Sequence, residues 1–373
     1  MGALTHDLVE ALEASDAERA LGLFQKHLSR KGDAWDMHLS AFPVAQRVMN
    51  PPFINPHLPK MHRIYRELTP FLEKEDVPAL IRLELTEFAR RPKLEKLPKA
   101  ALLTSRVVFS DVESSISRQD VEKTAVLMAT LYAQEGRADL ARRLLLLGSG
   151  YLDHSLGHSV SCTAFILLEM MERNDQDPWP ALATLADYFC KGRFHAAPTL
   201  RPSATPDPDA AITDNILRAT SGRGIVNLHH TITVYSMERV RQFFSPEEYS
   251  HLIGAWIEFM GEKEEEPIAL DSRGAEGVYE YGRFYGMFSR LEAKPATAYL
   301  APMFATPIER RRMWRFLIKS LCDLYQGDYN PHYLTGLGSV LWVLDRFRNQ
   351  TTISLNALYQ YLDFFFDGIR SRK

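Results

Sequence analysis

The sequence is poor in cysteine and has no long apolar run. Its three cysteines, Cys162, Cys190 and Cys322, are far apart and lie in apolar segments of the 373-residue chain. This number and spacing argue against a disulfide framework and indicate buried thiols in a reducing compartment. The N-terminus lacks the basic and apolar regions of a signal peptide, and no segment approaches the roughly 20 apolar residues of a membrane span. We expect a cytoplasmic protein without a membrane partner.

An excess of basic charge is also absent. The 44 lysines and arginines are outnumbered by 47 acidic residues, whereas nucleic-acid-binding proteins usually carry a basic face. The sequence contains no P-loop, no Gly-x-Gly-x-x-Gly after a strand and no Gly-x-Ser-x-Gly elbow. We therefore expect no nucleic-acid partner, and any use of NADPH would need a binding site without a recognised motif.

What the sequence does have is helical periodicity. Apolar residues recur every three to four positions, and glycine or proline interrupts the pattern, as Gly136 does between the segments 119–135 and 138–147. The pattern predicts further helices over 155–173, 226–244 and 331–347, whereas strand signals are sparse. The sequence predicts an all-α fold. No connecting segment has the Gly/Ser composition of a flexible tether, so we expect a single domain over residues 1–373.

Candidate chemistry lies in the histidines, of which there are twelve. His154 and His158 are four residues apart, so on a helix they share a face, and both rings can reach one metal ion. In the simpler interpretation, His154 caps a helix start. His229 and His230 are neighbours and point about 100° apart on a helix, so one faces inward and the other outward. Histidines without supporting context are expected at the surface: His6, His27, His38 and His195.

Four segments around the remaining histidines resemble the questin-oxidase-like family, helical oxygenases associated with the tailoring of aromatic polyketides. The segments occur in the family's order and are spread over most of the chain. They are Asn55-Pro-His-Leu-Pro-Lys-Met61, similar to Asn-His-Leu-Pro-Met; His154-Ser-Leu-Gly-His158, similar to His-Pro-Leu-Ile-His; His230-Thr-Ile-Thr233, similar to His-Ala-Val-Thr; and Asn330-Pro-His332, in place of Asp-x-His.

The resemblance implies a mononuclear metal centre that binds O₂ and acts on an aromatic or polyketide-type small molecule of secondary metabolism. The implied ligands are His57, His158, His230 and His332, with His154 as a further catalytic imidazole. Imidazole suits several transition metals, so the choice of Fe(II) comes from the resemblance alone. The chain departs from the family at Thr335, where the family has lysine, at Asn330, where it has aspartate, and by the inserted Pro56 and Lys60. The loss of the lysine and the aspartate is expected to alter the ligand field or a proton path.

An aromatic cluster over 279–288 could line the pocket of such an enzyme. Tyr281 and Tyr285 are the candidate catalytic tyrosines there, because buried hydroxyls need partners. A stripe that faces the core is the other interpretation.

Two other functions stay open. The segment 131–141 resembles half of a tetratricopeptide repeat, which would suit a non-catalytic, helical-repeat-like interaction protein, but no 34-residue period continues from it. A metal-free helical cyclase or isomerase could instead use the histidines as acid and base. The sequence predicts no oligomeric state.

Overall fold

The computed structural model describes residues 2–173, 176–192, 194, 197–198, 200, 204–269, 279–324 and 330–371. Across these residues the chain forms helices α1 to α19 and three short 3₁₀ helices, with isolated bridges but no β-strand. This confirms the predicted all-α class. Within the same residues, no helix combines the length and the apolar character needed to cross a membrane.

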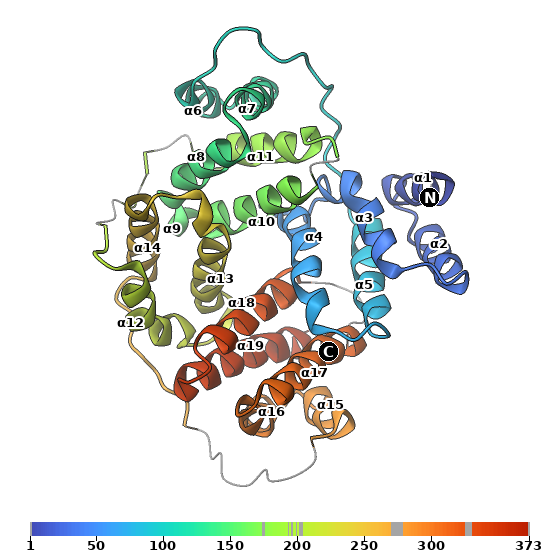
Figure 1. Cartoon of the computed structure of the whole chain (residues 1–373), viewed down its shortest axis with the longest axis vertical. Coiled ribbons are helices and arrows are strands. Elements are labelled where there is room, and N and C mark those ends of the chain that lie inside the picture. The colour runs from blue at the N-terminus through green and yellow to red at the C-terminus, as the bar shows by residue number, and fades with distance from the viewer. Residues whose placement is uncertain are drawn as a thin grey trace.

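Four helices form a closed ring in the middle of the molecule. They are α4 (His57–Leu68), α10 (His158–Glu172), α13 (Gly224–Val240) and α18 (His332–Arg346). Helix α4 packs on α10, α10 on α13, α13 on α18, and α18 on α4 (Figure 1). Most side chains of these helices are buried, because other helices cover the ring from outside. The ring holds the site described below.

The covering helices follow the order of the chain around this ring. On the α4 side lie α1 (Gly2–Glu13), α2 (Ala17–Ser29), α3 (Ala34–Ala45) and α5 (Val77–Arg90). Next to α10 and its neighbours lie α6 (Phe109–Ser117), α7 (Val121–Glu135), α8 (Arg137–Ser149), α9 (Leu152–Ser155) and α11 (Trp179–Lys191). Helices α12 (Pro208–Thr220) and α14 (Pro246–Met260) flank α13.

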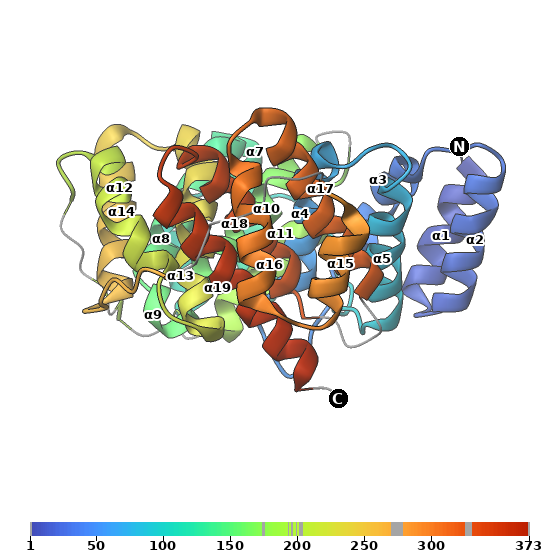
Figure 2. The same cartoon turned by 90° about the horizontal axis from the view of Figure 1, so that it is seen from below.

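The C-terminal part covers the remaining side of the ring with α15 (Tyr281–Ser289), α16 (Ala293–Leu300), α17 (Pro307–Leu324) and α19 (Thr351–Arg370). The 3₁₀ helices are Thr69–Phe71, Arg241–Phe243 and Ala301–Phe304. Figure 2 shows α1 and α2 at one end of the elongated molecule and α12 and α14 at the other.

The predicted helix over 155–173 is wrong at its start. Helix α9 ends at Ser155, Leu156 and Gly157 adopt left-handed backbone with φ of 49° and 76°, and α10 begins at His158. A Cβ at Gly157 would lie 2.0 Å from Oγ1 of Thr233 on α13. Glycine is therefore needed both for the turn and for the close approach of the start of α10 to α13.

Candidate metal centre

The helix ring brings four imidazoles together at one point. Three of them are the first residues of α4, α10 and α18, and the fourth lies in the second turn of α13. We call this group the histidine centre; it consists of His57, His158, His229 and His332. Its Nε2 atoms are close together: 2.7 Å from His57 to His158, 3.2 Å from His158 to His332, 3.2 Å from His229 to His158, and 3.1 Å from His229 to His332.

The structure places three of the four predicted ligands in this centre and replaces the fourth. His229 joins them, whereas His230, which the resemblance indicates, does not. The ring of His230 packs edge-on against Phe259 at 5.0 Å, and its backbone oxygen accepts a hydrogen bond from Trp256. Because neighbours on a helix point about 100° apart, only one of the two can face the centre. The sequence predicts one inward and one outward side chain, but the structure buries both, and only His229 faces the centre.

Hydrogen bonds on the outer ring nitrogens fix the orientation of three imidazoles. Nδ1 of His158 lies 2.5 Å from the backbone oxygen of Ser155, and Nδ1 of His229 lies 2.7 Å from that of Ile225. Nδ1 of His332 lies 2.8 Å from the side-chain oxygen of Asn330. These oxygens only accept, so each Nδ1 carries the proton and each Nε2 directs a lone pair into the centre.

The electrostatics keep these imidazoles neutral. Burial lowers the pKa of His57, His158 and His332 well below the usual range and that of His229 to about 4, and neighbouring cationic groups lower them further. Neutral imidazoles are the form that binds metals. Ligand nitrogens at 2.0–2.1 Å from one ion and at right angles to each other lie roughly 3 Å apart. The donor atoms of His57, His158 and His332 all lie within 4.8 Å of one another, which fits a transition-metal ion, and Nε2 of His229 lies beside two of them.

Two of the positions that depart from the family pattern, Asn330 and Thr335, have defined contacts. Asn330 accepts the Nδ1 proton of His332, which is a role that an aspartate could also fill. Thr335 is fully buried, and its hydroxyl lies 3.0 Å from Sδ of Met61 and 3.1 Å from the backbone oxygen of Pro331. The orienting hydrogen bond is thus retained, while no amine is present at position 335.

An amine does lie beside the centre, on α4. Lys60 is fully buried, and its Nζ has no hydrogen-bond partner among the described residues. Burial lowers the pKa of Lys60, while the nearby Cys162 opposes that shift. Lys60 in turn lowers the pKa of all four histidines of the centre. The sequence shows Lys60 only as a departure from the family segment, and nothing in it indicates that the amine is buried.

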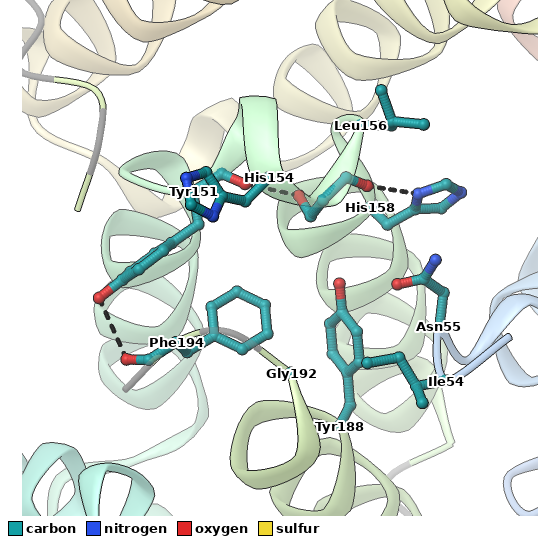
Figure 3. A pocket seen from close by; sticks show the side chains of 10 residues that line it. Ile54, Asn55, Tyr151, His154, Leu156, His158, Tyr188, Gly192 and Phe194 are labelled. Atoms are coloured by element: carbon teal, nitrogen blue, oxygen red, sulfur yellow. Dashed lines mark hydrogen bonds between the residues drawn. The ribbon is translucent and has the colours of Figure 1, made fainter. Parts of the chain in front are cut away.

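A cavity of about 360 Å³ adjoins the centre at His158. We call it the side cavity; its lining residues are Ile54, Asn55, Tyr151, His154, Ser155, Leu156, His158, Tyr188, Gly192 and Phe194 (Figure 3). His154 borders this cavity and lies outside the histidine centre, with Nε2 3.9 Å from the Asp153 carboxylate. The shared helix face expected for His154 and His158 does not exist, because the left-handed turn separates them.

The predicted catalytic tyrosines do not line this cavity. Tyr281 and Tyr285 stack on each other at 5.7 Å in α15, which Figure 1 shows well apart from α9 and α10. The hydroxyl of Tyr281 donates to Asp323 at 2.5 Å, so its partner is a surface carboxylate. The tyrosines that do line the cavity, Tyr151 and Tyr188, carry no signal in the sequence that separates them from core residues.

A second buried group lies between α3, α4 and α5. His38 and His62 each place Nδ1 2.7 Å from a different oxygen of Glu84, and their rings stack at 4.1 Å. All three side chains are fully buried, so the expectation of a surface position for His38 is wrong. Burial raises the pKa of Glu84 to about 7 and lowers that of His38 to about 3. His195 lies outside the described residues.

Neither a protein-family model, nor a curated protein, nor a solved structure matches the chain.

Proposed function

We propose that this protein is a metal-dependent oxygenase or oxidase that uses O₂ at a histidine-ligated iron to act on an aromatic small molecule. One observation supports the proposal above all others: three buried imidazoles and the partly buried His332 converge, and four pairs of their Nε2 atoms lie 2.7–3.2 Å apart. Three of these atoms direct lone pairs at one another, which is unfavourable unless a cation lies between them. A metal ion is the cation that neutral imidazoles bind best.

The residues of the chain would hold the ion and orient its ligands. The histidine centre supplies four nitrogen donors, and the oxygens of Ser155, Ile225 and Asn330 fix three of the rings from behind. Such outer hydrogen bonds set the tautomer and raise the basicity of the ligands. A bound iron would supply the electron exchange with O₂ that side chains cannot perform.

The side cavity would hold the organic substrate next to this centre. It adjoins the centre at His158, and aromatic rings form part of its wall. A volume of about 360 Å³ lies within the range of small-molecule sites. The helix ring and its covering helices bury most of the centre, which limits contact of the reacting groups with bulk water.

The convergence of the histidines favours this function over the non-catalytic interaction protein, for which we expect the same histidines to be dispersed over the surface. Metal content distinguishes it from a metal-free cyclase or isomerase. Imidazoles do not select iron over copper, nickel or zinc, so Fe(II) is proposed on the resemblance to the questin-oxidase-like family.

The test combines metal analysis with O₂ uptake. Protein purified without chelators should carry about one metal ion per chain. After anaerobic loading with Fe(II), O₂ consumption should depend on both iron and an added phenol or polycyclic ketone. Protein that retains no metal would refute the proposal, and so would iron-loaded protein whose O₂ consumption is unaffected by every aromatic compound in the panel.

A further inference from the structure

The side cavity has an aromatic wall of three rings. The rings of Tyr151 and Phe194 lie 5.1 Å apart at 74°, and those of Tyr188 and Phe194 lie 5.2 Å apart at 75°. Both are edge-to-face arrangements, which aromatic pairs prefer and which hold the rings in fixed orientations. Among the described residues that line the cavity, none is aspartate, glutamate, lysine or arginine. The wall therefore suits an uncharged ligand with flat rings.

The two tyrosine hydroxyls of this wall differ in one respect. The Tyr151 hydroxyl donates to the backbone oxygen of Phe194 at 3.1 Å. The Tyr188 hydroxyl has no hydrogen-bond partner among the described residues. It is also shielded from bulk water, since only 2% of Tyr188 is exposed. A buried hydroxyl without a partner is unfavourable, and a ligand oxygen or a water molecule can supply the missing hydrogen bond.

The unpaired hydroxyl is directed at the part of the cavity that adjoins the histidine centre. Figure 3 shows it pointing toward the end of the cavity where Asn55 and His158 lie. Burial holds the pKa of Tyr188 well above its usual range, so the group remains a donor at every working pH. A ligand oxygen bonded there would place the ligand's rings beside Phe194 and one of its edges toward His158.

We propose that Tyr188 is a positioning residue, whose hydroxyl donates a hydrogen bond to a carbonyl or ether-type oxygen of a flat, uncharged ligand in the side cavity. The aromatic wall binds the rings of that ligand, and Tyr188 selects the orientation in which its oxygen-bearing edge lies near the histidine centre. The inference rests on the proposed function for the role of the cavity, but the binding it describes requires neither metal nor turnover.

The test compares two ligands that differ only in an oxygen acceptor: 9-fluorenone and the hydrocarbon fluorene. Their dissociation constants are measured by equilibrium dialysis with the full chain, as purified and after metal removal by chelator. The wild-type chain should bind fluorenone about five- to tenfold more tightly than fluorene, as expected for one additional hydrogen bond. Tyr188→Phe should abolish that preference and leave the affinity for fluorene unchanged.

Tyr151→Phe is the matched control, because it removes a hydroxyl from the same wall that already has a protein partner. It should retain the preference for fluorenone. The proposal is overturned if the wild-type chain binds neither ligand or binds both equally, or if the preference survives Tyr188→Phe. A ratio of two affinities in one variant is insensitive to a general loss of stability. Since the metal-free chain is sufficient, failure here is distinguishable from failure of the metal or O₂ tests.

Discussion

The side-chain oxygen of Asn330 lies 2.8 Å from Nδ1 of His332 and 3.1 Å from the backbone nitrogen of the same residue. One carboxamide thus orients the imidazole and also caps the first turn of α18. Either asparagine or aspartate provides such an accepting oxygen. Asparagine at this position, where the family has aspartate, therefore keeps both hydrogen bonds.

Removing this oxygen should weaken metal binding without removing a ligand. We expect Asn330→Leu to raise the dissociation constant for Zn²⁺ by about 10- to 100-fold, because His332 loses the bond that fixes its tautomer. Asn330→Asp should bind Zn²⁺ at least as tightly as the wild type, because a carboxylate accepts the same bond and adds a negative charge near the ion. Competition with a chromogenic chelator measures both constants. Equal affinity in Asn330→Leu and the wild type would contradict the proposed role.

The adjacent histidines of α13 provide a matched pair. His229→Gln should lose most of the bound metal, because it removes one of the four converging Nε2 atoms. His230→Gln should retain it, since the ring of His230 packs against Phe259 outside the centre. Metal per chain after gel filtration is the measurement, with circular dichroism as the check on folding. If His230→Gln loses the metal and His229→Gln keeps it, the assignment is reversed.

Gly157 should be less tolerant of a side chain than Gly136. Both have positive φ, but only at Gly157 would a Cβ collide with a neighbour, Oγ1 of Thr233 at 2.0 Å; around Gly136 nothing lies within 4 Å. Gly136 has φ 97° and ψ 171°, a conformation nearly restricted to glycine, so we expect Gly136→Ala to lower the free energy of unfolding by about 1–3 kcal/mol from backbone strain alone. Gly157→Ala should cost roughly 3 kcal/mol or more, because strain and overpacking combine.

Urea unfolding of the two alanine variants measures this difference. Gly157→Ala should also weaken metal binding, because His158 follows directly and its Nδ1 depends on the turn at Ser155. Equal destabilisation by the two substitutions would show that the approach of α10 to α13 is looser than described.

The buried carboxyl of Glu84 should make stability depend on pH. Its pKa is about 7 in the folded chain because of burial, against roughly 4.3 when unfolded. The folded state binds the proton more tightly, so this stabilising contribution is present below about pH 4 and is lost as the pH rises to about 7. From pH 5 to pH 8 the wild type should therefore lose about 2–3 kcal/mol that Glu84→Gln does not lose.

The measurement is the free energy of unfolding of both proteins across this pH range, with metal absent. The pKa of His38 is lowered to about 3 by burial. Its contribution to the free energy of unfolding therefore has the opposite pH dependence: stability is lost as the pH falls below about 6.5. His38 and His62 are present in both proteins, so the difference reports Glu84 together with its coupling to these two imidazoles. Parallel curves would contradict the raised pKa.

The fold class could be predicted from the sequence because it depends on local features, whereas the placing of His57, His158 and His332 at one site was implied by the family resemblance. Periodic apolar residues and glycine breaks indicate helices, and a histidine directly after proline marks the starts of α4 and α18. The choice between His229 and His230 could not be predicted in this way. It depends on the rotation of α13 against α10 and α18, which is set by packing along the whole helix.

The position of the substrate cavity depends still more on tertiary structure. Tyr281 and Tyr285 have the spacing of a pocket wall, but their helix lies on another side of the molecule. Tyr188 belongs to a regular helix, and only the three-dimensional structure shows that its hydroxyl has no hydrogen-bond partner among the described residues. The complete burial of Lys60 and His38 could not be predicted from the sequence either, because charged or polar residues are usually exposed.

Anomalous X-ray scattering from a crystal of the protein purified without chelators tests the central claim most directly. The account predicts one strong peak at a transition-metal absorption edge, about 2.0–2.2 Å from Nε2 of His57, His158, His229 and His332. Data collected on both sides of the iron edge would identify the metal. A histidine centre without anomalous density, or a metal bound only elsewhere in the chain, would contradict it.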